Sequence, residues 1–288
     1  MIASAMSGKQ LPSPRIGSAR FVRTDALGGY MALAGSRFET RLPPHVHSSY
    51  VFGVVESGAV RVTTNHSSHV ASAGMVVLLS PFVVHTEIPV SEQGWTFRYL
   101  YPTDAVVREA LCAAPASSPA LRFGRPVIDD PGLATMITRV HQGLESGDPD
   151  GTTADALTSL VRQLAERYGR NRPDVESRER RNIGAVRDLI TERPLKSVKL
   201  QDLASAAGLS PFHFTRVFKN QIGLPPYAYY EQVRIAFAHQ LIHEGHDLTS
   251  VAYQLGYADQ SHLTRHFRRG SFTTPGKMAH FARTALKR

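Results

Sequence analysis

The sequence predicts an α+β protein of several domains, in which a small β-barrel and a pair of helices precede an all-α domain with two helix-turn-helix units. Three observations predict this fold class. The first third of the chain alternates apolar and polar residues with the period of a β-strand. The last third contains a degenerate repeat of a helix, a glycine turn and a second helix. The excess positive charge is confined to the same last third.

Strand periodicity extends over about residues 21–105, which we expect to form the barrel. Val60 and Val62 alternate with polar neighbours, and every second side chain of residues 95–101 is aromatic. Short strands at this spacing are typical of a small barrel or sandwich.

Two amphipathic helices are expected within residues 106–169. Their apolar residues fall at i, i+3, i+4, i+7 and i+11, which is the spacing of one helix face. These residues are Leu133, Met136, Ile137, Val140 and Leu144 in the first helix, and Leu157, Leu160, Val161, Leu164 and Tyr168 in the second. Such a pair either covers the barrel or forms a dimer interface. We favour the dimer interface, because the DNA-binding features described below suggest paired sites.

The remaining segments are expected to connect or precede the domains. Residues 1–20 are rich in Ser, Pro and Gly and are predicted to form a flexible arm, and residues 170–181 a polar linker.

Cys112 is the only cysteine, so an internal disulfide is impossible, which fits a reducing cytosol. No segment has the length and hydrophobicity of a membrane span. We therefore expect a cytoplasmic protein without a membrane partner.

The repeat in the last domain, residues 182–288, relates residues 200–222 to residues 248–270. Equivalent residues are 48 positions apart before the turn and 49 after it, so one residue is inserted at the turn. The equivalent pairs are Ala204 and Ala252, Gly208 and Gly256, Leu209 and Tyr257, Phe214 and Leu263, Arg216 and Arg265, and Phe218 and Phe267. We expect a positive φ at both glycines and helix caps at Ser210 and Asp259.

The charge distribution indicates a polyanionic partner. Residues 178–288 carry 17 Lys and Arg against 8 Asp and Glu, whereas residues 1–177 carry 16 of each. The net charge of +9 therefore lies in the domain with the repeat. Because contacts to phosphate supply much of the affinity for DNA, we expect double-stranded DNA as the partner.

The second helix of each unit is the one that enters a major groove. Its buried stripe is apolar, which leaves the opposite face for DNA. Arg216 and Arg265 hold equivalent places, and arginine binds the guanine edge with two hydrogen bonds, so we expect both to contact bases. The predicted DNA-binding residues are Phe212, His213, Thr215, Arg216, Lys219, Gln260, Ser261, His262, Arg265 and Arg268.

Residues 183–280 resemble the DNA-binding domain of AraC/XylS-type transcription regulators. The matching motifs are Ala204-x3-Gly208-Leu-Ser210, Phe214-x-Arg-x-Phe218, Gly223-x2-Pro226-x3-Tyr230, Val251-Ala-x3-Gly256-Tyr-x-Asp-x-Ser261-x-Leu-x-Arg265-x-Phe267, and Thr274-Pro275. One departure is Gly276-Lys-Met278, where the family usually carries a Tyr-Arg pair. The resemblance implies two helix-turn-helix units joined by a long helix. It puts the base-reading positions of the family on Phe212, Thr215, Arg216, Gln260, Ser261 and Arg265.

The first domain resembles, more loosely, the cupin-like effector domain of the same family. His45 and His47 share one face of a strand, Tyr50 follows, His85 lies after Pro81, and residues 95–101 are rich in aromatic side chains. The resemblance implies a site for a small-molecule effector. The expected effector-binding residues are His45, His47, Tyr50, His85, Trp95 and Tyr99.

Three interpretations of His45, His47 and His85 remain open. We favour hydrogen bonds to an organic effector over a metal site or a structural role. Three imidazoles are adequate ligands for zinc or iron. Enzymatic metal cupins usually carry a carboxylate three or four residues after the second histidine, where this chain has Tyr50 and Val51. We therefore expect no cofactor, no resident metal and no catalytic residues.

The preferred hypothesis is a ligand-responsive transcription activator that binds DNA as a homodimer and contacts RNA polymerase. Each subunit then reads two neighbouring segments of the major groove. One alternative is a metal-dependent cupin enzyme or metal sensor with an appended DNA-binding domain. Another is an architectural protein that binds DNA without sequence preference.

Overall fold

The computed structural model describes residues 16–24, 30–65, 67–114, 119–147, 152–169, 178–192, 198–271 and 273–285. Most of the expected arm, residues 1–15, lies outside them, as do residues 170–177 of the expected linker. The rest of both segments has regular structure. Ile16–Arg20 belong to strand β1, which pairs with β2, and Arg178–Arg181 begin helix α4. Regular structure therefore begins inside both segments, and the bounds of the flexible arm and the polar linker stay a prediction.

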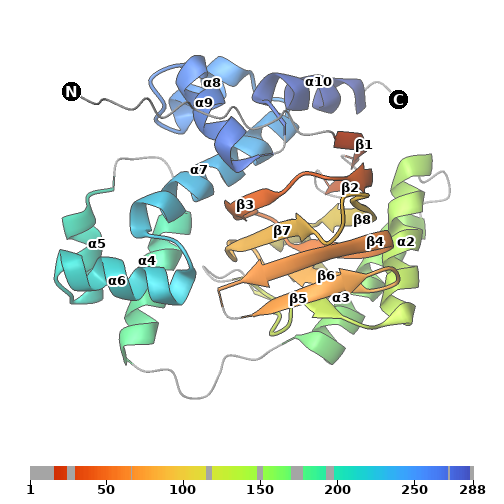
Figure 1. Cartoon of the computed structure of the whole chain (residues 1–288), viewed down its shortest axis with the longest axis horizontal. Coiled ribbons are helices and arrows are strands. Elements are labelled where there is room, and N and C mark those ends of the chain that lie inside the picture. The colour runs from red at the N-terminus through yellow and green to blue at the C-terminus, as the bar shows by residue number, and fades with distance from the viewer. Residues whose placement is uncertain are drawn as a thin grey trace, which may run out of the picture.

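The N-terminal part is a barrel-like β-structure (Figure 1). Its strands are β1 (Ile16–Thr24), β2 (Tyr30–Phe38), β3 (Leu42–His45), β4 (Val51–Thr64), β5 (Ser68–Ser72), β6 (Val76–Leu79), β7 (His85–Pro89), β8 (Trp95–Tyr101) and β9 (Val127–Ile128). The long strand β4 pairs with β8 and β6 through its first half and with β5 and β7 through its second half. Because β4 belongs to both sets of strands, they enclose a common interior. The described strands do not close into a complete barrel, since their order runs β1-β2-β8-β4-β6-β9.

The alternation of residues 95–101 predicted a strand, which is β8, and its aromatic side chains fill this interior. Trp95, Phe97 and Tyr99 are almost fully buried, and the rings of Phe97 and Tyr99 lie 4.4 Å apart. Glycines on the neighbouring strands make room for them. Gly53 on β4 lies opposite Tyr99, and a Cβ atom there would overlap the Tyr99 ring. The interior is therefore closely packed against glycine backbone.

Helices cover the outer face of the sheet. They are α1 (Asp104–Leu111), α2 (Pro131–Ser146) and α3 (Thr152–Tyr168). The predicted apolar stripes of α2 and α3 are buried in one cluster with Phe52, Val54, Leu78 and Leu100 of the sheet. These stripes cover the barrel, so a dimer interface on this segment would have to use other faces of the helices.

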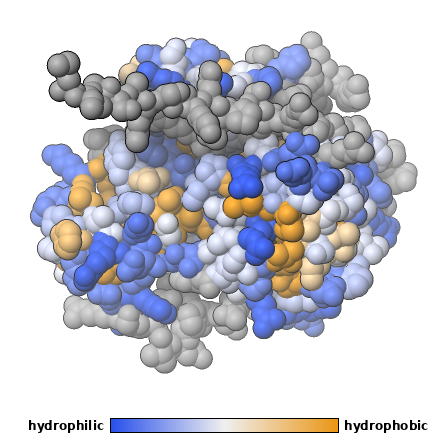
Figure 2. Space-filling view, viewed as in Figure 1, coloured by the Kyte–Doolittle hydropathy of each residue, from blue (hydrophilic) through white to orange (hydrophobic). Residues whose placement is uncertain are grey.

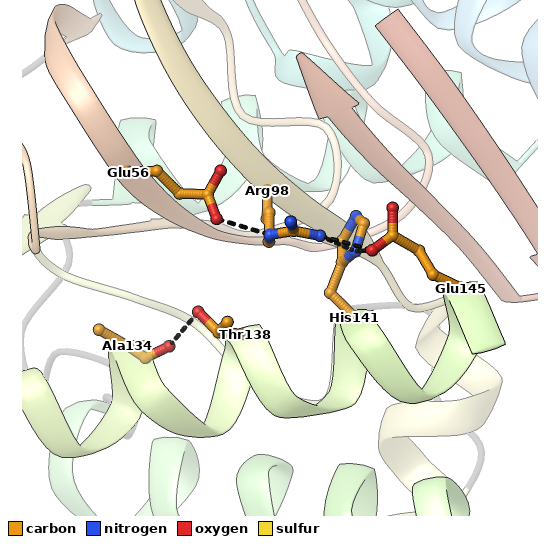
Figure 3. Close-up of polar contacts among 6 residues, drawn as sticks. All are labelled: Glu56, Arg98, Ala134, Thr138, His141 and Glu145. Atoms are coloured by element: carbon orange, nitrogen blue, oxygen red, sulfur yellow. Dashed lines mark hydrogen bonds and ion pairs between the residues drawn. The ribbon is translucent and has the colours of Figure 1, made fainter. Parts of the chain in front are cut away.

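Arg98 fastens α2 to the sheet (Figure 3). From β8 its guanidinium donates to Glu56 of β4 at 2.6 Å and to Glu145 of α2 at 2.7 Å. It also donates to Nδ1 of the fully buried His141 at 3.1 Å. One planar cation thus joins two strands and a helix, a task for which the arginine fork is suited.

The C-terminal part is all helical, as predicted. Its helices are α4 (Arg178–Glu192), α5 (Leu200–Ala207), α6 (Pro211–Ile222), α7 (Pro226–His243), α8 (Leu248–Gln254), α9 (Gln260–Gly270) and α10 (Pro275–Ala285). The departure at Gly276-Lys-Met278 does not prevent the last helix, in which Met278 is buried. Within the described part of the chain, no helix combines the length and apolarity that crossing a membrane requires.

The two parts are in contact through several helices, including α6 and α7, α9 beside β3 and α10 beside β1. The Tyr229 hydroxyl of α7 donates to the Phe82 carbonyl at 3.1 Å, and the Asn65 amide donates to the Asn220 carbonyl of α6 at 2.7 Å. The Phe82 ring lies 5.8 Å from that of Phe237. Figure 2 shows apolar residues over the sheet and between the sheet and the helices beside it.

The contact between Gly53 and Tyr99 leads to a stability prediction. Gly53→Ala should lower the free energy of unfolding by about 1–3 kcal/mol, because the added methyl group displaces a buried ring. Gly184→Ala is the control, since a Cβ atom there meets open space in α4. It should be neutral or stabilise the protein by up to about 1 kcal/mol. Urea denaturation followed by fluorescence measures both, and equal midpoints for the two variants would contradict the close packing.

Candidate nucleic-acid interface and sensor site

The two helix-turn-helix units share the same turn geometry. Gly208 and Gly256 both have the left-handed backbone predicted for them, with φ of 71° and 72°. The next residue in each unit donates its N–H to the first helix, Leu209 to the Ala204 carbonyl at 3.0 Å and Tyr257 to the Ala252 carbonyl at 2.9 Å. The sequence repeat is therefore a structural repeat.

Both second helices begin at the predicted caps. The Ser210 hydroxyl accepts the N–H of His213 at 3.4 Å, and the Asp259 carboxylate accepts the N–H of His262 at 2.7 Å. Each cap satisfies an amide at the helix start that has no carbonyl partner within the helix.

The faces of α6 and α9 divide as predicted. Phe214 and Phe218 of α6, and Leu263 and Phe267 of α9, are buried. Seven of the predicted DNA-binding residues are exposed: Phe212, Arg216, Lys219, Gln260, Ser261, Arg265 and Arg268. Phe212 is 83% exposed, which is unusual for an apolar ring on a water-facing surface. The contact of these side chains with DNA remains a prediction.

Three of the predicted DNA-binding residues are half-buried and already have partners. The Thr215 hydroxyl donates to the Pro211 carbonyl at 2.8 Å, and the His213 ring lies 3.8 Å from the Glu179 carboxylate. The His262 ring contacts the His266 ring, with the two Nε2 atoms 3.1 Å apart. Their present contacts suit the shaping of the helix surface more directly than the reading of bases.

Arg234 of α7 holds the second unit in place, and the sequence analysis missed it. Its Nε atom donates to the Leu255 carbonyl at 2.8 Å, and its guanidinium carbon lies 3.8 Å from the centre of the Tyr257 ring. A third contact, at 2.6 Å, joins it to Glu231. The available signal was a cation within the long helix that the family resemblance implies. Such a helix is packed between two units, and a cation buried there needs partners.

The three predicted histidines of the sensor come together. His45 ends β3 and lies opposite His85 of β7, and their ring centroids are 4.1 Å apart. The His47 ring lies 5.0 Å from His45 and 5.1 Å from His85. One ring nitrogen from each histidine lies within 4.8 Å of the others. We call these three residues the histidine cluster.

Hydrogen bonds to the backbone fix the orientation of two rings in the histidine cluster. His45 Nδ1 donates to the Pro43 carbonyl at 2.8 Å, and His85 Nδ1 donates to the Val83 carbonyl at 2.9 Å. Since a carbonyl only accepts, the proton of each neutral ring is on Nδ1 and the lone pair is on Nε2. Both Nε2 atoms are buried without a hydrogen-bond partner among the described residues. Leaving a buried acceptor unpaired costs about 1–3 kcal/mol.

Burial also keeps the histidine cluster neutral. It lowers the pKa of His45 to about 4, and the pKa values of His47 and His85 lie well below the usual value. For His47, electrostatic repulsion from His45, His85 and His239 adds to this shift. Neutral imidazoles are the form that accepts hydrogen bonds or binds metal ions.

The other predicted effector residues are not all at this site. Trp95 and Tyr99 lie in the filled interior. Tyr50 is on the opposite face of the sheet, where its hydroxyl donates to Asp104 at 3.0 Å and accepts the Leu121 N–H at 2.8 Å.

The sequence analysis also missed Glu87, whose buried carboxylate accepts the Tyr99 hydroxyl at 2.8 Å. Its position two residues after His85 was the available signal, since both side chains share one strand face.

A cleft of about 240 Å³ lies between the β-structure and the DNA-binding half. Leu79, Ser80 and Phe82 line it from the β-structure, and Arg187 of α4 and Gln221 of α6 line it from the helices. A molecule in this cleft would touch both halves of the chain.

Comparisons with known proteins agree with both halves. The model of the AraC-like ligand binding domain matches residues 30–165, and that of a helix-turn-helix domain matches residues 203–280. The chain is 23% identical over 249 residues to an HTH-type transcriptional regulator of Bacillus subtilis, YbfI, covering 84% of this chain and 89% of that relative. It is 22% identical over 232 residues to the lactose operon transcription activator of Staphylococcus xylosus, covering 77% and 82%.

A solved structure with the same architecture is ToxT from Vibrio cholerae. The TM-score is 0.57 at 13% sequence identity, with 92% of this chain and 97% of ToxT covered. At this identity the likeness shows the fold, and the fold includes both the β-structure and the helical part.

The contacts of Arg234 lead to a prediction for the second helix-turn-helix unit. Arg234→Leu should reduce the free energy of unfolding by about 2–4 kcal/mol, because the Leu255 carbonyl loses its donor and Glu231, which also faces His266 at 2.8 Å, loses its arginine in a largely buried site. Hydrogen exchange should accelerate in residues 248–270 before other regions. Arg216→Leu, on an exposed face, should change stability by less than about 0.5 kcal/mol. Equal stability of the two variants would show that Arg234 does not hold the unit.

Proposed function

Because the chain belongs to the AraC/XylS-type family of transcription regulators, we propose that it is a ligand-responsive transcription activator rather than an enzyme. In this proposal it binds double-stranded DNA with sequence specificity as a cytoplasmic homodimer. Each subunit inserts α6 and α9 into adjacent segments of the major groove. A small-molecule effector then changes how the DNA-binding halves are presented, and the bound dimer contacts RNA polymerase.

The observation that carries the proposal is the equivalence of the two reading helices. Each has the same turn, a capped start, a buried apolar stripe and an exposed arginine at the same position, Arg216 or Arg265. A repeated surface of this kind has no role in packing the domain itself. It fits direct readout of two groove segments, in which arginine recognises guanine. The net charge of +9 in the same half adds attraction to phosphate.

The cleft supports the effector-responsive part of the proposal. An effector there would contact Ser80 of the β-structure together with Arg187 and Gln221 of the DNA-binding half. The effector would favour one arrangement of the halves only if its affinity for that arrangement is higher than its affinity for the other. The name of the Staphylococcus xylosus relative, an activator of the lactose operon, supports activation as the direction of the response.

The base-reading part is tested with Arg216→Ala and Arg265→Ala. Each should cost about 1–3 kcal/mol of specific binding and relax preference at one base position, because a bidentate contact is lost. Arg61→Ala is the matched control, since it removes the same charge from an exposed position on β4. Fluorescence anisotropy with promoter DNA from upstream of the gene and with random DNA, at several salt concentrations, measures affinity and specificity together.

The outcomes separate three possibilities. Loss of promoter binding with unchanged binding to random DNA supports base contacts. An equal loss of affinity for both DNAs, with a smaller salt dependence, would show that these arginines contact phosphates and not bases. Equal affinity of the wild-type protein for both DNAs at physiological salt would contradict a specific regulator and favour an architectural protein.

Footprinting tests the arrangement of the units on DNA. Each subunit should protect two adjacent major-groove segments about one helical turn apart, 10–10.5 base pairs. Protection of a single segment per subunit, with Arg265→Ala leaving the pattern unchanged, would mean that only the first unit reads DNA.

A further inference from the structure

The histidine cluster has features that neither DNA binding nor packing explains. Two buried imidazoles have their Nδ1 protons bound to backbone carbonyls, and their Nε2 lone pairs lack a hydrogen-bond partner within the described part of the chain. A third imidazole, His47, lies about 5 Å from both rings. Packing alone is served better by apolar side chains, because they leave no acceptor unsatisfied.

The arrangement matches the needs of a metal ion. Metal-binding histidines usually donate their other ring N–H to a carbonyl or carboxylate, which orients the ligand nitrogen. His45 and His85 already do so through Pro43 and Val83. The imidazole nitrogens of a tetrahedral zinc site are about 3.4 Å apart, with Zn–N distances of about 2.0–2.1 Å. Small rotations from the present separations, all within 4.8 Å, would bring the three nitrogens around an ion.

We propose that His45, His47 and His85 bind a divalent transition-metal ion, with Zn²⁺ as the preferred ion, and that this ion helps hold the β-structure against α7. Neutral nitrogen ligands select zinc and its neighbours over Mg²⁺ and Ca²⁺, which require oxygen ligands. Three protein ligands leave one coordination position for water or another small ligand.

The site lies where it can act on the DNA-binding half. His239 of α7 interacts electrostatically with His45 and His47, and its ring stacks on Phe267 of α9 with the centroids 4.3 Å apart. Val46 and Val84, each adjacent in sequence to a ligand, belong to the hydrophobic cluster of the first helix-turn-helix unit. Residues that flank the ligands therefore pack against the first unit, and β3, which ends at the ligand His45, contacts the second reading helix α9.

The metal site is tested on the full chain after chelation and dialysis, with Zn²⁺ by calorimetry and with Co²⁺ by absorption. The wild-type protein should bind one Zn²⁺ per chain and give the visible bands of nitrogen-coordinated Co²⁺. His45→Asn and His85→Asn should abolish stoichiometric binding. Asparagine keeps an N–H donor near the Nδ1 position and has no nitrogen at the Nε2 position, so the backbone bond and the fold should persist. Circular dichroism checks the fold.

His69→Asn is the matched control, since it changes a half-buried histidine of β5 outside the histidine cluster. It should bind Zn²⁺ as the wild-type protein does. Failure of the wild-type protein to bind Zn²⁺ at tens of micromolar would overturn the proposal, and so would undiminished binding by the His45 and His85 variants. If either variant fails to fold, the Co²⁺ spectrum of the wild-type protein decides: bands without nitrogen coordination would overturn the site.

The action of the ion on α7 rests on the proposed function, and it is tested by DNA affinity, separately from Zn²⁺ binding. Zn²⁺ should change the affinity of the wild-type protein for promoter DNA at least fivefold. His239→Ala should still bind Zn²⁺ but weaken that change, because it removes one of the contacts that join this region to α9. Zn²⁺ binding without an effect on DNA affinity would overturn the action on α7 and leave the site supported. Zn²⁺ binding by a protein without any DNA preference would contradict the proposed function alone.

Discussion

The burial of α7 on both of its sides is the constraint on which the rest of the structure depends. Tyr229 and Val233 belong to the core of the first helix-turn-helix unit, and Ile235 and Ile242 belong to the core of the second. The same helix reaches the β-structure through the Tyr229 hydroxyl, which donates to the Phe82 carbonyl. Since close-packed interiors do not deform gradually, the spacing of the two reading helices is fixed by this one helix.

The buried side of an element could be predicted from the sequence where its opposite side faces water. The stripes of α2, α6 and α9 were predictable, because one side of each helix is polar. The buried residues of α7 lie all around the helix, so periodicity could not predict which side meets which neighbour, and the long helix was expected from the family resemblance. Arg234 is a buried cation on that helix, and its role depends on the positions of Tyr257 and Leu255, which the sequence does not give.

The sensor half divides in the same way. Alternation predicted a strand at β8 but not that Trp95 and Tyr99 fill the interior, where Gly53 leaves room for the Tyr99 ring. The contact between His45 and His85 joins strands that are distant in sequence, and their register depends on pairing that local patterns do not encode. Tyr50 precedes β4, outside the alternating pattern, so its position on the opposite face could not be predicted.

The junction between the halves combines hydrogen bonds with apolar contacts from Val46, Phe82 and Val84. Two hydrogen bonds across it, from Asn65 and Tyr229, are each worth about 1 kcal/mol, which is comparable to the coupling energies of about 1–3 kcal/mol typical of allosteric proteins. The junction touches the first unit beside the cleft and the second where β3 contacts α9. Because α7 joins both contacts rigidly, a change at either one alters the position of both reading helices relative to the β-structure. Their spacing to each other stays constant, so a signal would change the presentation of the DNA-binding half and not its specificity.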